Sequence, residues 1–162
     1  MMWRRGARKI PAALFGYVLL VGFLPLQAAE WKGGGTVTYV PVKVEQSTLP
    51  SGQTVVRTDL SGVVLADDTS NPFHLAGQTC EGTTIISAKG PSAAGYCNTI
   101  DKDGDAWWIW WRGEGKGKGG VWEFVDGTGK YKGIKGKGTT TTLVRFPDGR
   151  QVLRWQGSWR LK

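Results

Sequence analysis

The segment spanning residues 101–142 constrains the fold most, because tryptophan-rich runs alternate there with runs of glycine. Five of the nine tryptophans of the chain lie in it: Trp107, Trp108, Trp110, Trp111 and Trp122. Aromatic and β-branched side chains suit the pleated, half-buried surface of a sheet, and glycine suits the turns between strands. The segment therefore predicts short antiparallel strands.

The same alternation continues along the rest of the chain after residue 29. We predict strands at residues 33–45, 53–66, 83–88, 96–100, 106–112, 121–125, 140–146 and 151–162. Residues 73–80 are ambiguous, and residues 89–95 are predicted as a turn or loop. The glycine-rich residues 126–139 predict tight turns and close approach of neighbouring backbone. No helical periodicity interrupts these strands. The fold class is therefore all-β, a single antiparallel β-barrel of about eight strands, with a β-sandwich as the alternative.

Side chains of the predicted strands separate by face. In residues 106–112, Trp107, Ile109 and Trp111 share one face, and the other two tryptophans of this run point the opposite way. Residues 151–162 alternate apolar and polar side chains in the same manner. The candidate ligand-binding residues are Trp107, Trp111, Trp122, Trp155 and Trp159. A barrel of about eight strands can hold one small ligand, so these tryptophans line a cavity or, alternatively, fill the core.

The first 29 residues have the parts of a signal peptide. A stretch with four basic residues precedes an apolar run at 10–24, and small residues follow at Ala28 and Ala29. We predict that residues 1–29 are removed and that residues 30–162 form a single β-barrel domain, periplasmic or secreted, without a membrane span. The alternative is a membrane anchor, because residues 10–29 approach the roughly 20 apolar residues that a bilayer requires.

Charge narrows the range of partners. The net charge of +8 includes four basic residues and no acid from the first 29 residues, so the predicted mature chain is only moderately basic. Nucleic acid is therefore not an expected partner. Lysines interleaved with glycine are the candidates for an anionic partner: Lys130, Lys132, Lys135 and Lys137, together with Lys116 and Lys118. Such a cluster is otherwise typical of a solvated loop.

The two cysteines, Cys80 and Cys97, lie in the predicted exported part of the chain. An even pair in an oxidising compartment predicts a disulfide, and closing so short a loop contributes about 3 kcal/mol in the chain-entropy model. A zinc site would lack one ligand even with His74, the single histidine. His74 itself is more typical of a structural residue, because catalysis requires an orienting partner that the sequence does not identify.

Two motifs resemble ion or phosphate sites without matching them. Asp101, Asp103 and Asp105 alternate as in a calcium loop, but an EF-hand needs glycine sixth and glutamate twelfth, where this chain has Ala106 and Arg112. An Asp-Gly hairpin turn fits better. The glycine-rich residues 126–139 lack the GxxxxGK[ST] phosphate loop. The sequence predicts no metal site and no cofactor.

Residues 123–134, which read EFVDGTGKYKGI, with Gly136 and Gly138 after them, resemble the GGTGKF/Y…G motif of the allene oxide cyclase-like and dirigent-like β-barrels. Small bacterial exported members have a similar arrangement of hydrophobic strand, glycine-rich turn, GTGKY and closing strand. The resemblance covers roughly the last third of the chain at motif level. It implies an eight-stranded barrel with an apolar cavity, sometimes oligomeric. The plant enzymes steer cyclisation or radical coupling with polar cavity residues, none of which matches here.

Three functions remain open at this point. The first is a barrel that binds a small apolar or aromatic ligand. The second is a cyclase- or isomerase-type enzyme acting in the same cavity, with no catalytic residue assignable because the strand register is open. The third is a lysine-rich module that binds anionic polymers. The fold alone does not decide between these three functions.

Overall fold

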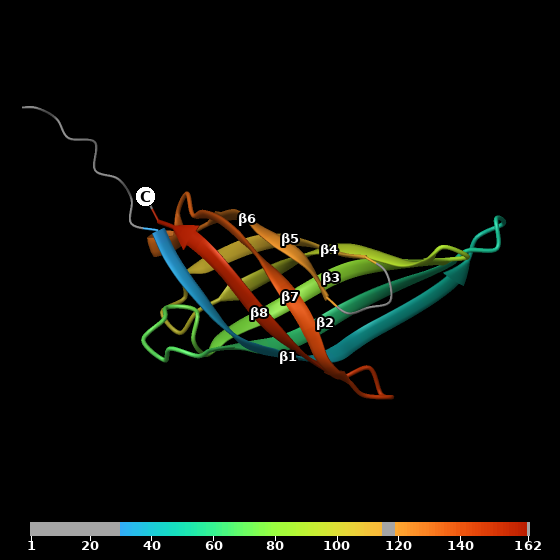
Figure 1. The fold of residues 1–162 in the computed structure, drawn as a ribbon, viewed down its shortest axis with the longest axis horizontal. Coiled ribbons are helices and arrows are strands. Elements are labelled where there is room, and N and C mark those ends of the chain that lie inside the picture. Colours follow the sequence, from blue (N-terminus) through green and yellow to red (C-terminus); the bar gives the residue numbers. More distant parts are fainter. Residues whose placement is uncertain (1–29, 115–118, 162) are drawn as a thin grey trace, which may run out of the picture.

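A computed structural model describes residues 30–114 and 119–161. They form one closed barrel of eight antiparallel strands, in which each strand pairs with its neighbours in sequence and the last pairs with the first (Figure 1). The strands are β1 (Glu30–Thr48), β2 (Thr54–Ala66), β3 (Ala76–Ser87), β4 (Gly90–Ile100), β5 (Ala106–Glu114), β6 (Gly119–Gly127), β7 (Lys135–Arg145) and β8 (Gln151–Arg160). The predicted barrel is confirmed. The predicted signal peptide, residues 1–29, lies outside the described residues.

Two segments that were predicted as loops or turns are strands. β4 already begins at Gly90 and β7 at Lys135, so the turn prediction is wrong for residues 90–95 and 135–139, whereas Lys89 lies in a turn as predicted. Their glycines make room for indole rings from neighbouring strands. A Cβ atom on Gly95 would overlap Trp111, and one on Gly138 would overlap Trp122. Glycine therefore serves here as a packing position for tryptophan across the inside of the barrel, not as a turn residue.

One end of the barrel is filled by aromatic side chains, which we call the plug. Phe73 enters from the β2–β3 connection, and its ring centroid lies 4.7 Å from that of Trp107 and 4.6 Å from that of Trp159. Tyr131 enters from the 3-10 helix η1 (Gly129–Tyr131) and is 0% exposed, as is Ile134 just after it. The plug lies at the end of the barrel where β1 begins and β8 finishes, because Phe73 packs on Trp159 of β8. Figure 1 shows these two strand ends next to each other.

The GTGKY motif builds the plug. Gly129 has a φ of +48°, which glycine adopts without strain, and a Cβ atom there would overlap the Asp105 carboxylate. A Cβ atom on Gly127 would lie 2.6 Å from both the Cβ atom and the carbonyl oxygen of Tyr131. These glycines let η1 turn tightly and carry Tyr131 into the barrel. The motif is therefore structural.

The other end of the barrel is uneven. β1 to β4 are 19, 13, 12 and 11 residues long, whereas β5 and β6 have nine each, so one wall projects past the other (Figure 1). Within β1, the pairing with β2 shifts between Pro41 and Lys43, as expected of a proline that lacks a ladder donor. Across residues 30–114 and 119–161, no helix has the length and apolar character needed to cross a bilayer.

Candidate functional site

A cavity of about 390 Å³ occupies the uneven end of the barrel. Its walls come from all eight strands and carry mainly small, apolar and threonine side chains, among them Leu60, Thr84, Ala93, Ile109 and Leu153. Tyr39, Trp122 and the Cys80–Cys97 pair lie at its inner end, which we call the floor. Small-molecule sites are typically concave, mostly apolar and about 300–1,000 Å³ in volume. The cavity is therefore large enough to hold one small ligand.

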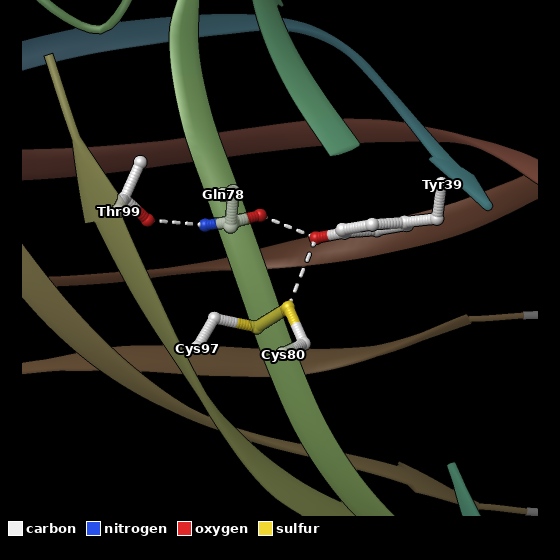
Figure 2. The surroundings of a disulfide bond; sticks show 5 residues. All are labelled: Tyr39, Gln78, Cys80, Cys97 and Thr99. Carbon is white, nitrogen blue, oxygen red and sulfur yellow. Dashed lines mark hydrogen bonds between the residues drawn. A yellow bond between two sulfur atoms is a disulfide. The ribbon is translucent and has the colours of Figure 1, made fainter. Parts of the chain in front are cut away.

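A buried chain of hydrogen bonds lies beneath the floor, on the side of a small inner void, and joins three strands. The Tyr39 hydroxyl from β1 donates a short hydrogen bond to Oε1 of Gln78, whose Nε2 donates to Thr99 Oγ1 at 2.6 Å (Figure 2). Burial raises the pKa of Tyr39, so its hydroxyl keeps its proton at neutral pH. Sequence reasoning missed this chain. The available signal was a glutamine at an inward position of β3, in a segment that the sequence left ambiguous.

The predicted disulfide is confirmed. Cys80 and Cys97 face each other in the β3–β4 register, with Cα atoms 4.0 Å apart, and are bonded to each other. Cys80 Sγ lies 3.5 Å from the Tyr39 hydroxyl, so the bond adjoins the hydrogen-bond chain (Figure 2). Since both sulfur atoms are joined in the disulfide, neither cysteine can ligate zinc as a thiolate. His74 lies in the β2–β3 connection, where its Nδ1 contacts the carbonyl of Ala66 at 3.1 Å, a structural contact.

The five candidate tryptophans divide between the two ends of the barrel. Trp111 and Trp122 line the large cavity. Trp107, Trp155 and Trp159 are buried with the plug and do not line that cavity. A void of only about 60 Å³ lies beside Trp107, Trp122 and Trp155, between the plug and the floor. The barrel is thus filled at one end and hollow at the other, and both sequence-based alternatives describe part of it.

Polar residues at the mouth were not identified from the sequence. Thr140 and Thr142 from β7 face the cavity, followed by Arg145, and Gln151 faces it from β8. Strict alternation from Thr142 would place residue 144 inside and residue 145 outside. The register instead shifts between Thr142 and Val144, which turns Arg145 inward. A β-bulge of this kind has no marker in the local sequence.

The four candidate lysines of residues 130–137 lie near the plugged end, and Lys116 and Lys118 lie outside the residues that the structure describes. Lys130 is bound by two carboxylates, at 2.7 Å from Asp101 Oδ2 and 2.6 Å from Asp103 Oδ2. Lys132, Lys135 and Lys137 are exposed. Lys137 pairs in register with Glu123 of β6. The positive charge of this group is therefore offset in part by its own neighbours.

Asp101 organises the turn between β4 and β5. Its Oδ1 accepts the backbone N–H groups of Asp103 at 2.9 Å and Asp105 at 3.1 Å, and its Oδ2 lies 2.8 Å from the Tyr131 hydroxyl. The predicted Asp-Gly turn is confirmed, with Gly104 at a φ of +89°. In the described part of the chain, no three carboxylate, imidazole or thiol groups are arranged to hold a metal ion.

Stability at acid pH is expected to depend on Asp101. Burial opposes ionisation, but hydrogen bonds from Lys130, Tyr131 and the Asp103 amide outweigh it, so the pKa of Asp101 lies below its ordinary value of 3.8. A lowered folded-state pKa stabilises the fold above the unfolded pKa, and this contribution is lost as the pH falls through the folded value. We expect Asp101→Asn to lower the unfolding free energy at pH 7 by roughly 1–3 kcal/mol. The difference in unfolding free energy between this variant and wild type should become smaller below about pH 4, as measured by denaturant titrations. A constant deficit across that range would contradict this role.

The closed eight-stranded antiparallel barrel defines the fold class, and solved structures share this fold. No known family profile matches the chain, and no curated protein does. The pterocarpan synthase dirigent protein GePTS1 has 16% identity and a TM-score of 0.54, over 82% of this chain and 86% of that one. The pterocarpan synthase dirigent protein PsPTS1 has 12% identity and a TM-score of 0.55, over 82% and 96%. The chain therefore has the dirigent-like barrel fold, and the resemblance drawn from the GTGKY motif is confirmed at the level of fold.

Proposed function

We propose that this protein binds one small, largely apolar molecule in the cavity at the open end of the barrel. The observation that carries the proposal is the contrast between the two ends. Aromatic rings fill the plugged end, whereas the walls of the open end carry smaller side chains and leave about 390 Å³ unoccupied by protein. Burying apolar ligand surface there contributes roughly 25 cal/mol per Å².

Binding is favoured over catalysis by the state of the polar groups at and beneath the floor. Tyr39, Gln78 and Thr99 satisfy one another, and the raised pKa of Tyr39 makes its phenol a poor general base. Both solved neighbours are named as pterocarpan synthases, which is the basis for keeping a cyclase as the alternative. We assign no catalytic residue. The lysine-rich alternative is weakened because Lys130 is already paired with Asp101 and Asp103.

The proposal is tested with N-phenyl-1-naphthylamine, an uncharged apolar dye that fluoresces when bound. Ala93 lines the cavity from β4, whereas its neighbour Ala94 is exposed on the outer face. Strands accept tryptophan readily, so Ala93→Trp should fold and fill much of the cavity. We expect its affinity for the dye to fall by at least about tenfold, or 1.4 kcal/mol.

The matched control is Ala94→Trp, which adds the same side chain on the opposite face of the same strand. We expect this variant to keep wild-type dye affinity. Thermal unfolding of both variants checks that each has folded. If wild type does not bind the dye, or if the two variants bind it equally well, binding inside the barrel is excluded for ligands of this kind.

A further inference from the structure

We infer that the ligand carries an anionic group and that the Arg145 guanidinium at the cavity mouth recognises it. This inference rests on the proposed function, because it specifies the chemistry of the molecule that the cavity takes. An apolar body would occupy the cavity above the floor, and a carboxylate or sulfonate group would lie at the rim. Arg145 is then the residue that determines specificity for an anion.

The strand geometry places Arg145 at the mouth. The bulge in β7 between Thr142 and Val144 reverses the alternation, so that Arg145 lies opposite Gln151 and both line the cavity. Arg145 Nη2 donates to Gln151 Oε1 at 3.0 Å. A guanidinium has five N–H donors, so this bond orients the group and leaves other donors for a ligand. Because the side-chain amide of Gln151 is neutral, this hydrogen bond does not compensate the positive charge of Arg145.

Two other arginines of the β7–β8 hairpin are each paired with a carboxylate, and Arg160 lies at the plugged end, away from the cavity. Arg150 pairs with Asp148 at 2.7 Å, and Arg154 forms an ion pair with Asp67. Within the described residues, Arg145 makes no ion pair, and no carboxylate lines the cavity. Arg112 also lines the mouth, but this residue has an interaction of its own. Among the residues that the structure describes, Arg145 therefore contributes a cation that no carboxylate balances.

The surroundings of Arg145 favour an anion with an apolar body. Arg145 is exposed at the rim of a cavity whose walls are mainly apolar, so its charge attracts an anion there while water still screens part of the field. Arginine binds planar carboxylate and sulfonate groups through two parallel N–H bonds. Thr142 from β7 adds a hydroxyl on the same wall. A neutral apolar ligand would leave the remaining N–H donors of Arg145 bonded to water only.

Two matched dyes test the inference. 8-Anilinonaphthalene-1-sulfonate has the ring system of N-phenyl-1-naphthylamine with an added sulfonate. We expect wild type to bind the sulfonate dye more tightly than the neutral dye, and Arg145→Gln to weaken the sulfonate dye by about tenfold, the size of a charged hydrogen bond. Affinity of this variant for the neutral dye should stay unchanged. Arg145→Lys should restore part of the loss, because it keeps the charge but not the planar fork.

The control is Arg150→Gln, which removes the same charge from the same hairpin at a position outside the cavity lining. We expect it to bind both dyes as wild type does. Competition between the dyes confirms that they share one site. If wild type binds the neutral dye as tightly as the sulfonate, or if both glutamine variants bind the sulfonate equally, the inference is overturned while the proposed function stands. If neither dye binds, both are overturned.

Discussion

Replacing Tyr131 with alanine is expected to lower the unfolding free energy by about 3–5 kcal/mol, the range for deleting a buried aromatic ring. Tyr131 is 0% exposed, and its ring lies 4.6 Å from that of Trp107 and 5.9 Å from that of Phe73. Its loss leaves a hole in the plug that η1 cannot refill, because the tight turn fixes its path. Denaturant unfolding followed by tryptophan fluorescence measures the change.

Tyr131→Phe separates the ring from its hydroxyl. This variant keeps the packing but removes the hydroxyl that lies 2.8 Å from Asp101 and 3.1 Å from the Pro72 carbonyl. Its cost should be smaller, about 1.5–3 kcal/mol for a hydrogen bond to a charged group. Equal losses in the two variants would mean that the ring contributes no packing energy. Dye binding should survive in both, because the plug lies at the other end of the barrel from the cavity.

The strands and their inward faces were predictable, because the alternation of side chains in a strand depends only on residues that are close in sequence. In β5, Trp107 and Trp111 face inward as expected, and in β8 Trp155 and Trp159 do so. Each of these assignments needs only the period of two in a strand. The number of such strands and the turns between them predicted a closed barrel or a sandwich, and the structure shows the barrel.

The features of the fold that the sequence did not predict depend on contacts between residues that are far apart in sequence. Gly95 and Gly138 look like turn residues until the indoles that cover them, Trp111 and Trp122, are placed by the neighbouring strands. The plug depends on Phe73, which comes from a connection between strands and not from a strand face. No pattern in the sequence indicates that a residue from a loop will fill one end of the barrel. The sequence therefore predicted inward tryptophans but not which of them would line a cavity.

The candidate site was harder to predict than the fold for the same reason. Arg145 faces the cavity only because the bulge after Thr142 shifts the register of β7 against β8. Bulges are set by the pairing of two strands, so one strand's sequence leaves the shift open. The Tyr39–Gln78–Thr99 chain likewise joins β1, β3 and β4. The cysteine pair was the exception, since two cysteines allow a single disulfide.

Removing the disulfide is the second change with a large expected effect. Cys80 and Cys97 are separated by 17 residues, and loss of a cross-link that closes a loop of this size is expected to lower the unfolding free energy by about 2–4 kcal/mol. We expect this loss in Cys97→Ser. The dependence of unfolding on denaturant should also steepen, because the uncrosslinked chain exposes more surface when it unfolds.

The control compares wild type and a Cys80→Ala, Cys97→Ala double variant, each with and without a reductant under unfolding conditions. Reductant should lower the stability of wild type towards that of the double variant and leave the double variant unchanged. Both alanines lie at the cavity floor, where Cys80 now contacts Tyr39, so the cavity should deepen and dye binding should persist. If reductant leaves wild-type stability unchanged, the pairing of β3 with β4 holds this wall of the barrel without help from the disulfide.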